Sequence, residues 1–96
     1  MSMQRDTPPR FLFHGTSPEA ARKIGGAMGR QYVHLSIDTA IAVQVGRRKS
    51  SRPVILRLNA RPAHDNGVGF YRGNDTVWLA DFVPPSFIGE FGPTDR

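Results

Sequence analysis

The sequence predicts a single α+β domain built on a split antiparallel β-sheet. A chain of 96 residues is the size of one domain. Two short helical segments come early and are followed mainly by short strands, an order typical of α+β folds. A doubly wound parallel sheet is excluded, because the helices are too few and no GxGxxG sequence follows a strand.

The first half of the domain is predicted to alternate strand and helix. Its strands are rich in aromatic and β-branched residues. Thr16 or Ser17 can cap the first helix, which ends at a pair of glycines, and Asp38 can cap the second, which ends at Gly46. We expect strands over residues 10–15 and 31–36 and helices over residues 18–24 and 39–45.

The second half is predicted to be mostly strand. The sequence PVILRLN is a β-branched strand headed by Pro53, a residue that suits a strand start. Gly, Asn-Asp and Pro-Pro separate the later strands. We expect a basic loop over 47–52, a strand over 53–59, a turn or single helical turn over 60–67, and strands over 69–73, 76–80 and 86–92. Residues 1–9 and 92–96 are expected to be a flexible arm and tail, which leaves a domain over 10–91.

The charge pattern indicates a polyanionic partner. The net charge is +5, and residues 47–72 hold seven basic residues against one acid, Asp65. Arginine grips phosphate with two hydrogen bonds, so nucleic acid or a dinucleotide fits this segment, although the cluster alone does not outweigh a solvated basic face as the explanation. Cysteine is absent, and neither a long apolar run nor a signal-peptide core is present. We therefore expect a soluble, cytoplasmic protein that does not contact a membrane.

Several kinds of catalytic site are excluded by the residues present. The three histidines, His14, His34 and His64, show no metal-binding spacing, and there is no cysteine to help them, so we expect no metal. A GxSxG nucleophile elbow is absent, and the carboxylates form no obvious pair.

Two copies of a His-x-Ser/Thr pattern remain as candidates for a binding site. His14 and Thr16 would share one face of the first strand, and His34 and Ser36 would share one face of the second. Gly15 lies between the first pair and would let a ligand approach the backbone. Such an arrangement suits a flat polar ligand held across two adjacent strands, whereas two structural histidines bonded to nearby carbonyls are the equally weighted alternative.

The ordered segments FLFHGTS, MGRQYVHLS, AVQVGRR…RPVILRL and GVGFYRGNDTVWLADFVPPSFI resemble a known family. They are similar to the C-terminal, NAD⁺-binding lobe of the RNA 2′-phosphotransferases, which have the ADP-ribosyltransferase fold. The resemblance runs from about residue 11 to 88. It does not extend to the winged-helix lobe that precedes this one in family members and supplies an Arg-His-Arg set for the RNA 2′-phosphate.

The resemblance implies an NAD⁺ site with named residues. Gly15 would present its backbone to the nicotinamide carboxamide, while His14 would bond a ribose hydroxyl. Arg30 matches the catalytic arginine of this lobe, and His14 is the other residue for which a catalytic role is implied. Thr16, His34, Ser36, Tyr71 and Val77 would complete the NAD⁺-binding set.

Three functions are consistent with these residues. The first is NAD-dependent ADP-ribosyl transfer to RNA or a related acceptor, with a toxin that requires a neutralising or immunity protein as one form of it. The second is RNA 2′-phosphotransfer, in which the 2′-phosphate leaves through ADP-ribosylated RNA. The third is a non-catalytic module that binds NAD⁺ or nucleic acid. His14, Arg30 and His34 argue against the third.

Overall fold

The computed structural model describes residues 4–21, 33–81 and 83–93. It confirms the α+β class. One antiparallel sheet has the strand order β1-β5-β6-β3-β2-β4-β7. The strands are β1 Gln4–Arg5, β2 Phe11–Thr16, β3 Val33–Ser36, β4 Val54–Asn59, β5 Phe70–Arg72, β6 Val77–Ala80 and β7 Ile88–Pro93. The helices are α2 Thr39–Arg47, α3 Ala60–Asp65 and the 3₁₀ turn η1 Pro85–Phe87. Residues 18–21 are also helical.

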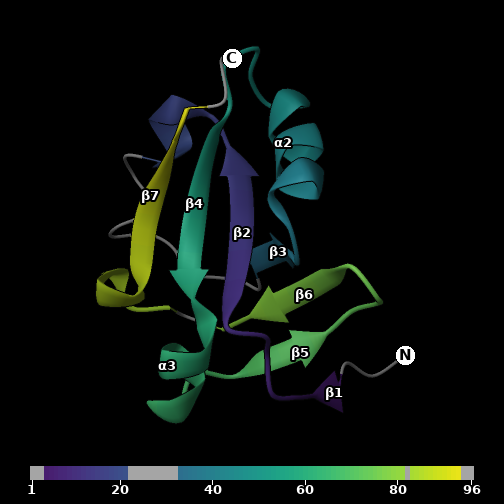
Figure 1. Ribbon diagram of the computed structural model, residues 1–96, viewed down its shortest axis with the longest axis vertical. Coiled ribbons are helices and arrows are strands. Elements are labelled where there is room, and N and C mark those ends of the chain that lie inside the picture. Colours follow the sequence, from purple (N-terminus) through teal and green to yellow (C-terminus); the bar gives the residue numbers. More distant parts are fainter. Residues whose placement is uncertain (1–3, 22–32, 82, 94–96) are drawn as a thin grey trace.

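The sheet is split between β2 and β3. β2 pairs with β4 at all six of its residues, but with β3 only through Phe13 and Ser36. The strands β2, β4 and β7 therefore form one half of the sheet, and β3, β6, β5 and β1 form the other. Figure 1 shows the two halves running in clearly different directions. Residues 14–16 of β2 border this split without pairing to β3.

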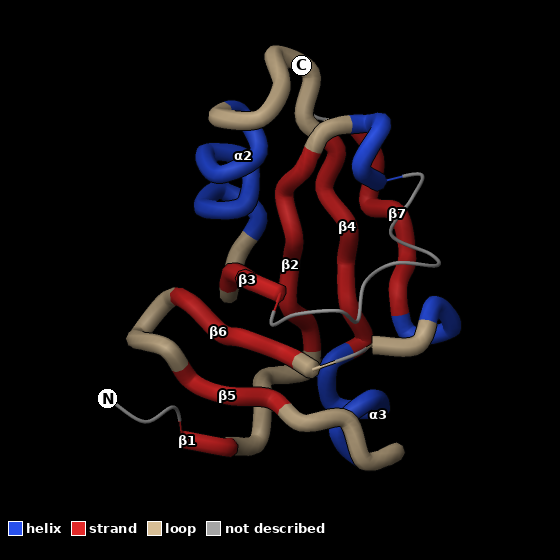
Figure 2. The backbone as a smooth tube through the Cα atoms, turned by 180° about the vertical axis from the view of Figure 1, so that it is seen from behind, coloured by secondary structure: helices blue, strands red, loops and turns tan. Residues whose placement is uncertain are grey.

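The hydrophobic core joins the two halves on one face of the sheet. Leu12 of β2 and Leu58 of β4 are fully buried, and they share a cluster with Leu35 of β3 and Trp78 of β6. Strand alternation brings these residues to the same face, because Leu12 pairs with Leu58 and Leu35 pairs with Trp78. The other buried members are Ala60, Ala63, Val68, Phe70, Ala80 and Val83. In Figure 2, α3 and η1 lie at the same end of the β2–β4–β7 half.

The helix α2 begins where the sequence predicts and packs on the split edge of β2. The Asp38 side chain caps it, since the Ile41 amide donates to Asp38 Oδ1 at 2.8 Å. The helix reaches Arg47, so Gly46 lies in its last turn instead of ending it. Two glycines allow this turn to contact β2: a Cβ on Gly46 would lie 3.3 Å from the carbonyl carbon of Gly15 and 2.7 Å from Pro53 Cβ.

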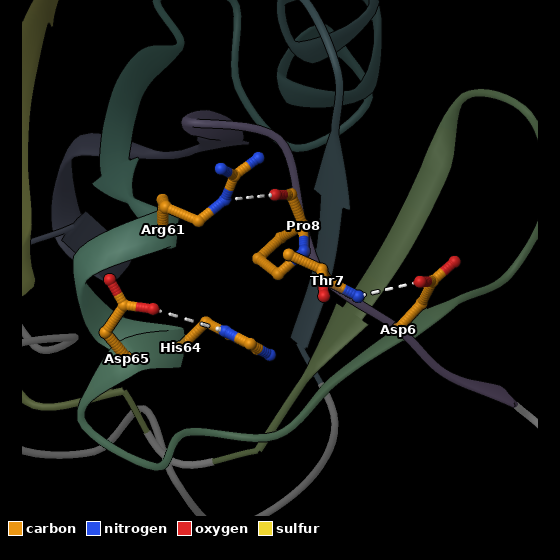
Figure 3. A network of polar contacts seen from close by, with 6 residues as sticks. All are labelled: Asp6, Thr7, Pro8, Arg61, His64 and Asp65. Carbon is orange, nitrogen blue, oxygen red and sulfur yellow. Dashed lines mark hydrogen bonds and ion pairs between the residues drawn. The ribbon is translucent and has the colours of Figure 1, made fainter.

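Residues 4–8, part of the expected N-terminal arm, pair with or pack against the domain. Gln4 and Arg5 pair with β5, and Pro8 is buried. Arg61 Nε of α3 donates to the carbonyl oxygen of Pro8 at 2.9 Å, which ties this segment to the helix (Figure 3). A two-residue polar strand carries no hydrophobic pattern, so the sequence had no signal for it. At the other end, β7 extends to Pro93, two residues past the predicted domain limit.

No described helix is both long enough and apolar enough to span a bilayer. No group of three or more His, Cys, Asp or Glu residues in the described ranges could hold a metal ion.

Candidate NAD-binding site

The split in the sheet places the two histidine strands side by side. His14 follows directly after Phe13, the last residue of β2 that pairs with β3. His14 Nδ1 lies 3.0 Å from the backbone carbonyl oxygen of His34. The side chain of His14 thus bridges the gap where backbone pairing between the two strands has stopped.

This contact defines the chemical state of His14. A carbonyl oxygen can only accept a hydrogen bond, so Nδ1 must carry the proton. Burial is the main cause that lowers the pKa of His14 below 6.5. The hydrogen bond to the His34 carbonyl raises the pKa, whereas the charges of Lys49 and His34 lower it further. The ring is therefore neutral at pH 7. Its Nε2 carries a lone pair and can accept a hydrogen bond from a hydroxyl group.

A second group of predicted site residues shares one face of the other half-sheet. Ser36 pairs with Val77, and His34 and Tyr71 both pair with Leu79. Residues paired across antiparallel strands point to the same face, and so do residues two apart along a strand. His34, Ser36, Val77 and Tyr71 therefore lie on one face, opposite the Leu35–Trp78 core.

The two His-x-Ser/Thr patterns do not share a face of the sheet. Phe13 pairs with Ser36, so alternation places Phe13 with His34 on one face and His14 with Thr16 on the other. His14 contacts the backbone of His34 at the strand edge. Thr16 and Ser36 are buried, at 2% and 6% exposure, whereas His34 is exposed.

Gly15 has a packing role that the sequence did not indicate. A Cβ at this position would overlap the carbonyl oxygen of Ala42 and would lie 2.8 Å from its carbonyl carbon. Glycine is therefore required for α2 to approach β2. Contact of the Gly15 backbone with a nicotinamide carboxamide stays a prediction.

Comparisons with known proteins identify the family of the chain. The model of the family "RNA 2'-phosphotransferase, Tpt1 / KptA family" matches residues 1–82. The chain belongs to this family. It is 48% identical over 89 residues to a probable RNA 2'-phosphotransferase of Bacillus thuringiensis subsp. konkukian, a match that covers 88% of this chain and 48% of the relative.

Other relatives of the Tpt1/KptA family give the same result. A probable RNA 2'-phosphotransferase of Acetivibrio thermocellus is 45% identical over 89 residues, covering 88% of this chain and 49% of the relative. One of Escherichia coli O9:H4 is 40% identical over 92 residues, covering 92% and 50%. The chain thus spans about half the length of the curated relatives it matches. The resemblance in sequence to RNA 2′-phosphotransferases is confirmed at the level of the family.

Asp81 and Gly69 lie beside Tyr71, and neither was predicted from the sequence as a site residue. Tyr71 Oη donates to Asp81 Oδ2 at 3.0 Å. Gly69 leaves the space for this contact, because a Cβ there would lie 2.8 Å from Tyr71 Oη. The only sequence signal for Asp81 was its position, an acidic residue directly after the predicted strand over 76–80. Arg30, the predicted catalytic arginine, lies outside the described residues.

Proposed function

We propose that this chain carries the NAD⁺-binding part of an RNA 2′-phosphotransferase and acts in the removal of a 2′-phosphate from RNA. One observation carries the proposal. In a chain of the Tpt1/KptA family, His14 is held at the split of the sheet with Nδ1 on the His34 carbonyl, and Nε2 has no hydrogen-bond partner among the described residues. An imidazole acceptor with a fixed orientation fits a ribose hydroxyl, which needs a partner for its proton.

The roles of the chain's residues follow from their positions. His14 would accept a hydrogen bond from a ribose hydroxyl through Nε2 and would not act as an acid, because burial disfavours its protonated form. His34, Ser36, Val77 and Tyr71 would contact NAD⁺ from the face of β3, β5 and β6 that they share, and Thr16 would lie beside His14 on the other side of the split. Arg30 would hold the attacking phosphate by charge and by paired hydrogen bonds.

When bound, NAD⁺ would supply an electrophilic ribose carbon and nicotinamide as a good leaving group. The rate would then depend on how the protein positions the two reactants and on preorganised charge near the ribose. Displacement of nicotinamide in this way requires no metal ion and no strong general acid from the chain.

The reaction is tested by mass spectrometry of 2′-phosphorylated and unphosphorylated RNA after incubation with the chain and NAD⁺. Loss of the 2′-phosphate with release of cyclic-phosphorylated ADP-ribose supports the proposal. ADP-ribose left on either RNA supports ADP-ribosyl transfer as the complete reaction. The relatives named above are probable RNA 2'-phosphotransferases, which favours this reaction over ADP-ribosyl transfer by a toxin.

Binding of NAD⁺ is tested separately by calorimetric titration. His14→Ala should weaken binding by roughly tenfold, the effect of losing one hydrogen bond of about 1.4 kcal/mol. His64→Ala, which removes a histidine of α3, should leave affinity unchanged. Equal affinity of wild type and His14→Ala, with both folded, would contradict the proposed role of His14.

A further inference from the structure

An exposed aromatic residue with two arginines lies on the sheet face opposite His14. Phe11 of β2 is 37% exposed and is the only aromatic among the exposed large hydrophobic residues that the structure describes. The guanidinium carbon of Arg57 lies 4.9 Å from the centre of its ring, and that of Arg10 lies 5.8 Å from it. We call this group the Arg10–Phe11–Arg57 patch.

The register explains why the patch is on this face. Phe13 pairs with Arg57 and Phe11 pairs with Asn59, so these four side chains point away from the Leu12–Leu58 core. Along β2, Phe11 and Phe13 alternate with His14 and Thr16, whose side chains point to the other face. The patch is therefore on the face opposite His14 and the core, the face that Phe13 shares with Ser36 and His34.

Among the described residues, little packs over the patch. Gly89 of β7 pairs with Arg57, and a Cβ placed there would meet only the Arg57 carbonyl oxygen, at 4.0 Å. The helix α2 covers this face further along β2, at Gly15, not at Phe11. Among the described side chains that β2 and β4 contribute to this face, none is acidic.

A single exposed phenylalanine is ordinary on a protein surface. Here two of the three cation–aromatic contacts found among the described residues converge on the same ring. An aromatic ring beside guanidinium planes offers stacking surfaces for a nucleobase, while the positive charge attracts the neighbouring phosphates. A second copy of this chain fits less well, because two such patches would bring like charges together.

We propose that the Arg10–Phe11–Arg57 patch binds single-stranded RNA by stacking a base and contacting its phosphates. The inference goes beyond the proposed function, and relies on it only for the choice of RNA as the probe. Its test needs neither NAD⁺ nor a 2′-phosphate, so it can fail or succeed independently of the phosphotransfer assay.

The probes are a fluorescent uridine oligonucleotide of about 12 nucleotides and an abasic strand of equal length and charge, followed by fluorescence anisotropy. Phe11→Leu, which keeps an apolar side chain, should weaken RNA binding at least about fivefold, the lower limit for loss of one base–aromatic stack. The abasic strand should bind more weakly than RNA and should not distinguish Phe11→Leu from wild type.

Arg57 provides a second test with a matched control. Arg57→Gln should weaken binding and lower the salt-dependence slope by about 0.7, the value for one phosphate contact on a single strand. Arg57→Lys should keep the slope but lose affinity, since lysine lacks the planar group. Arg72→Gln is the control: Arg72 lies 5.9 Å from the centre of the Trp78 ring, on the core face of β5 and β6, and its loss should change neither value.

Three results would overturn the proposal. One is equal RNA affinity of wild type and folded Phe11→Leu, with folding checked by urea unfolding. Another is an Arg72→Gln effect as large as that of Arg57→Gln, which would indicate attraction by net charge alone. The third is sedimentation showing a dimer that Phe11→Leu dissociates, which would make the patch an interface between two copies. If Phe11→Leu does not fold, the two Arg57 variants decide the outcome.

Discussion

Replacing Gly15 by alanine should destabilise the protein strongly, although it adds a single methyl group. The added Cβ would overlap the Ala42 carbonyl oxygen and lie 3.0 Å from the Gly46 amide nitrogen. These are backbone atoms of α2, so no side-chain rotation can relieve the overlap, and the helix must move from β2. Overpacking of this kind costs about 1–3 kcal/mol, and we expect the upper part of that range.

The measurement is urea unfolding followed by the fluorescence of Trp78, the only tryptophan, which is 4% exposed. A loss of about 3 kcal/mol corresponds to a fall in Tm of roughly 12–24 °C for a domain of this size. The free energy of unfolding should fall with little change in the denaturant slope, since the unfolded chain is nearly the same.

Gly89→Ala and Gly67→Ala are the matched controls. Gly89 has open space, so Gly89→Ala should be neutral or slightly stabilising, through lower entropy of the unfolded chain. Gly67 also has open space but has φ of +98°, so Gly67→Ala should cost about 1 kcal/mol through backbone strain. Equal stability of Gly15→Ala and Gly89→Ala would refute the packing of α2 on Gly15.

Three further predictions concern named contacts. Burial lowers the pKa of His14 below 6.5, so the unfolded chain binds a proton more readily, and wild type should lose stability as the pH falls through 6.5; His14→Gln should lack this loss in urea titrations at pH 7.5 and 5. Asp38→Ala removes the cap on the Ile41 amide and should lower the free energy of unfolding by about 1 kcal/mol, with reduced helix signal in circular dichroism. Tyr71→Phe should cost about 1.5 kcal/mol because Asp81 loses its donor, whereas Asp81→Asn keeps an acceptor and should cost less; equal unfolding free energies for the two variants would contradict this account.

Much of the fold could be predicted because its elements carry strong local signals. The strand PVILRLN and the Asp38 cap are examples, and both occur at the expected positions. The pairing of Gln4 and Arg5 with β5 could not be predicted, because it depends on partners more than sixty positions away and on no apolar pattern.

The sequence could name residues for the candidate site but not their geometry. The repeated His-x-Ser/Thr pattern and the family resemblance both identified His14 and His34, and the structure places the His14 ring against the His34 carbonyl. Which faces they occupy depends on register, and a shift of one residue exchanges the two faces of a strand. The single Phe13–Ser36 pair sets that register, and nothing in the two strand sequences specifies it.

The three residues after Phe13 show why one short segment can serve both fold and function. His14 turns to the edge of β3, where its Nδ1 compensates for the backbone pairing that ends at Phe13. Gly15 turns to the opposite face and admits α2. Thr16 returns to the side of His14 and is buried beside Val54. The helix that Gly15 admits also brings Lys49 near His14, and that charge helps to keep the imidazole neutral. A bulkier residue at position 15 should therefore perturb His14 through the position of α2, even without touching a ligand.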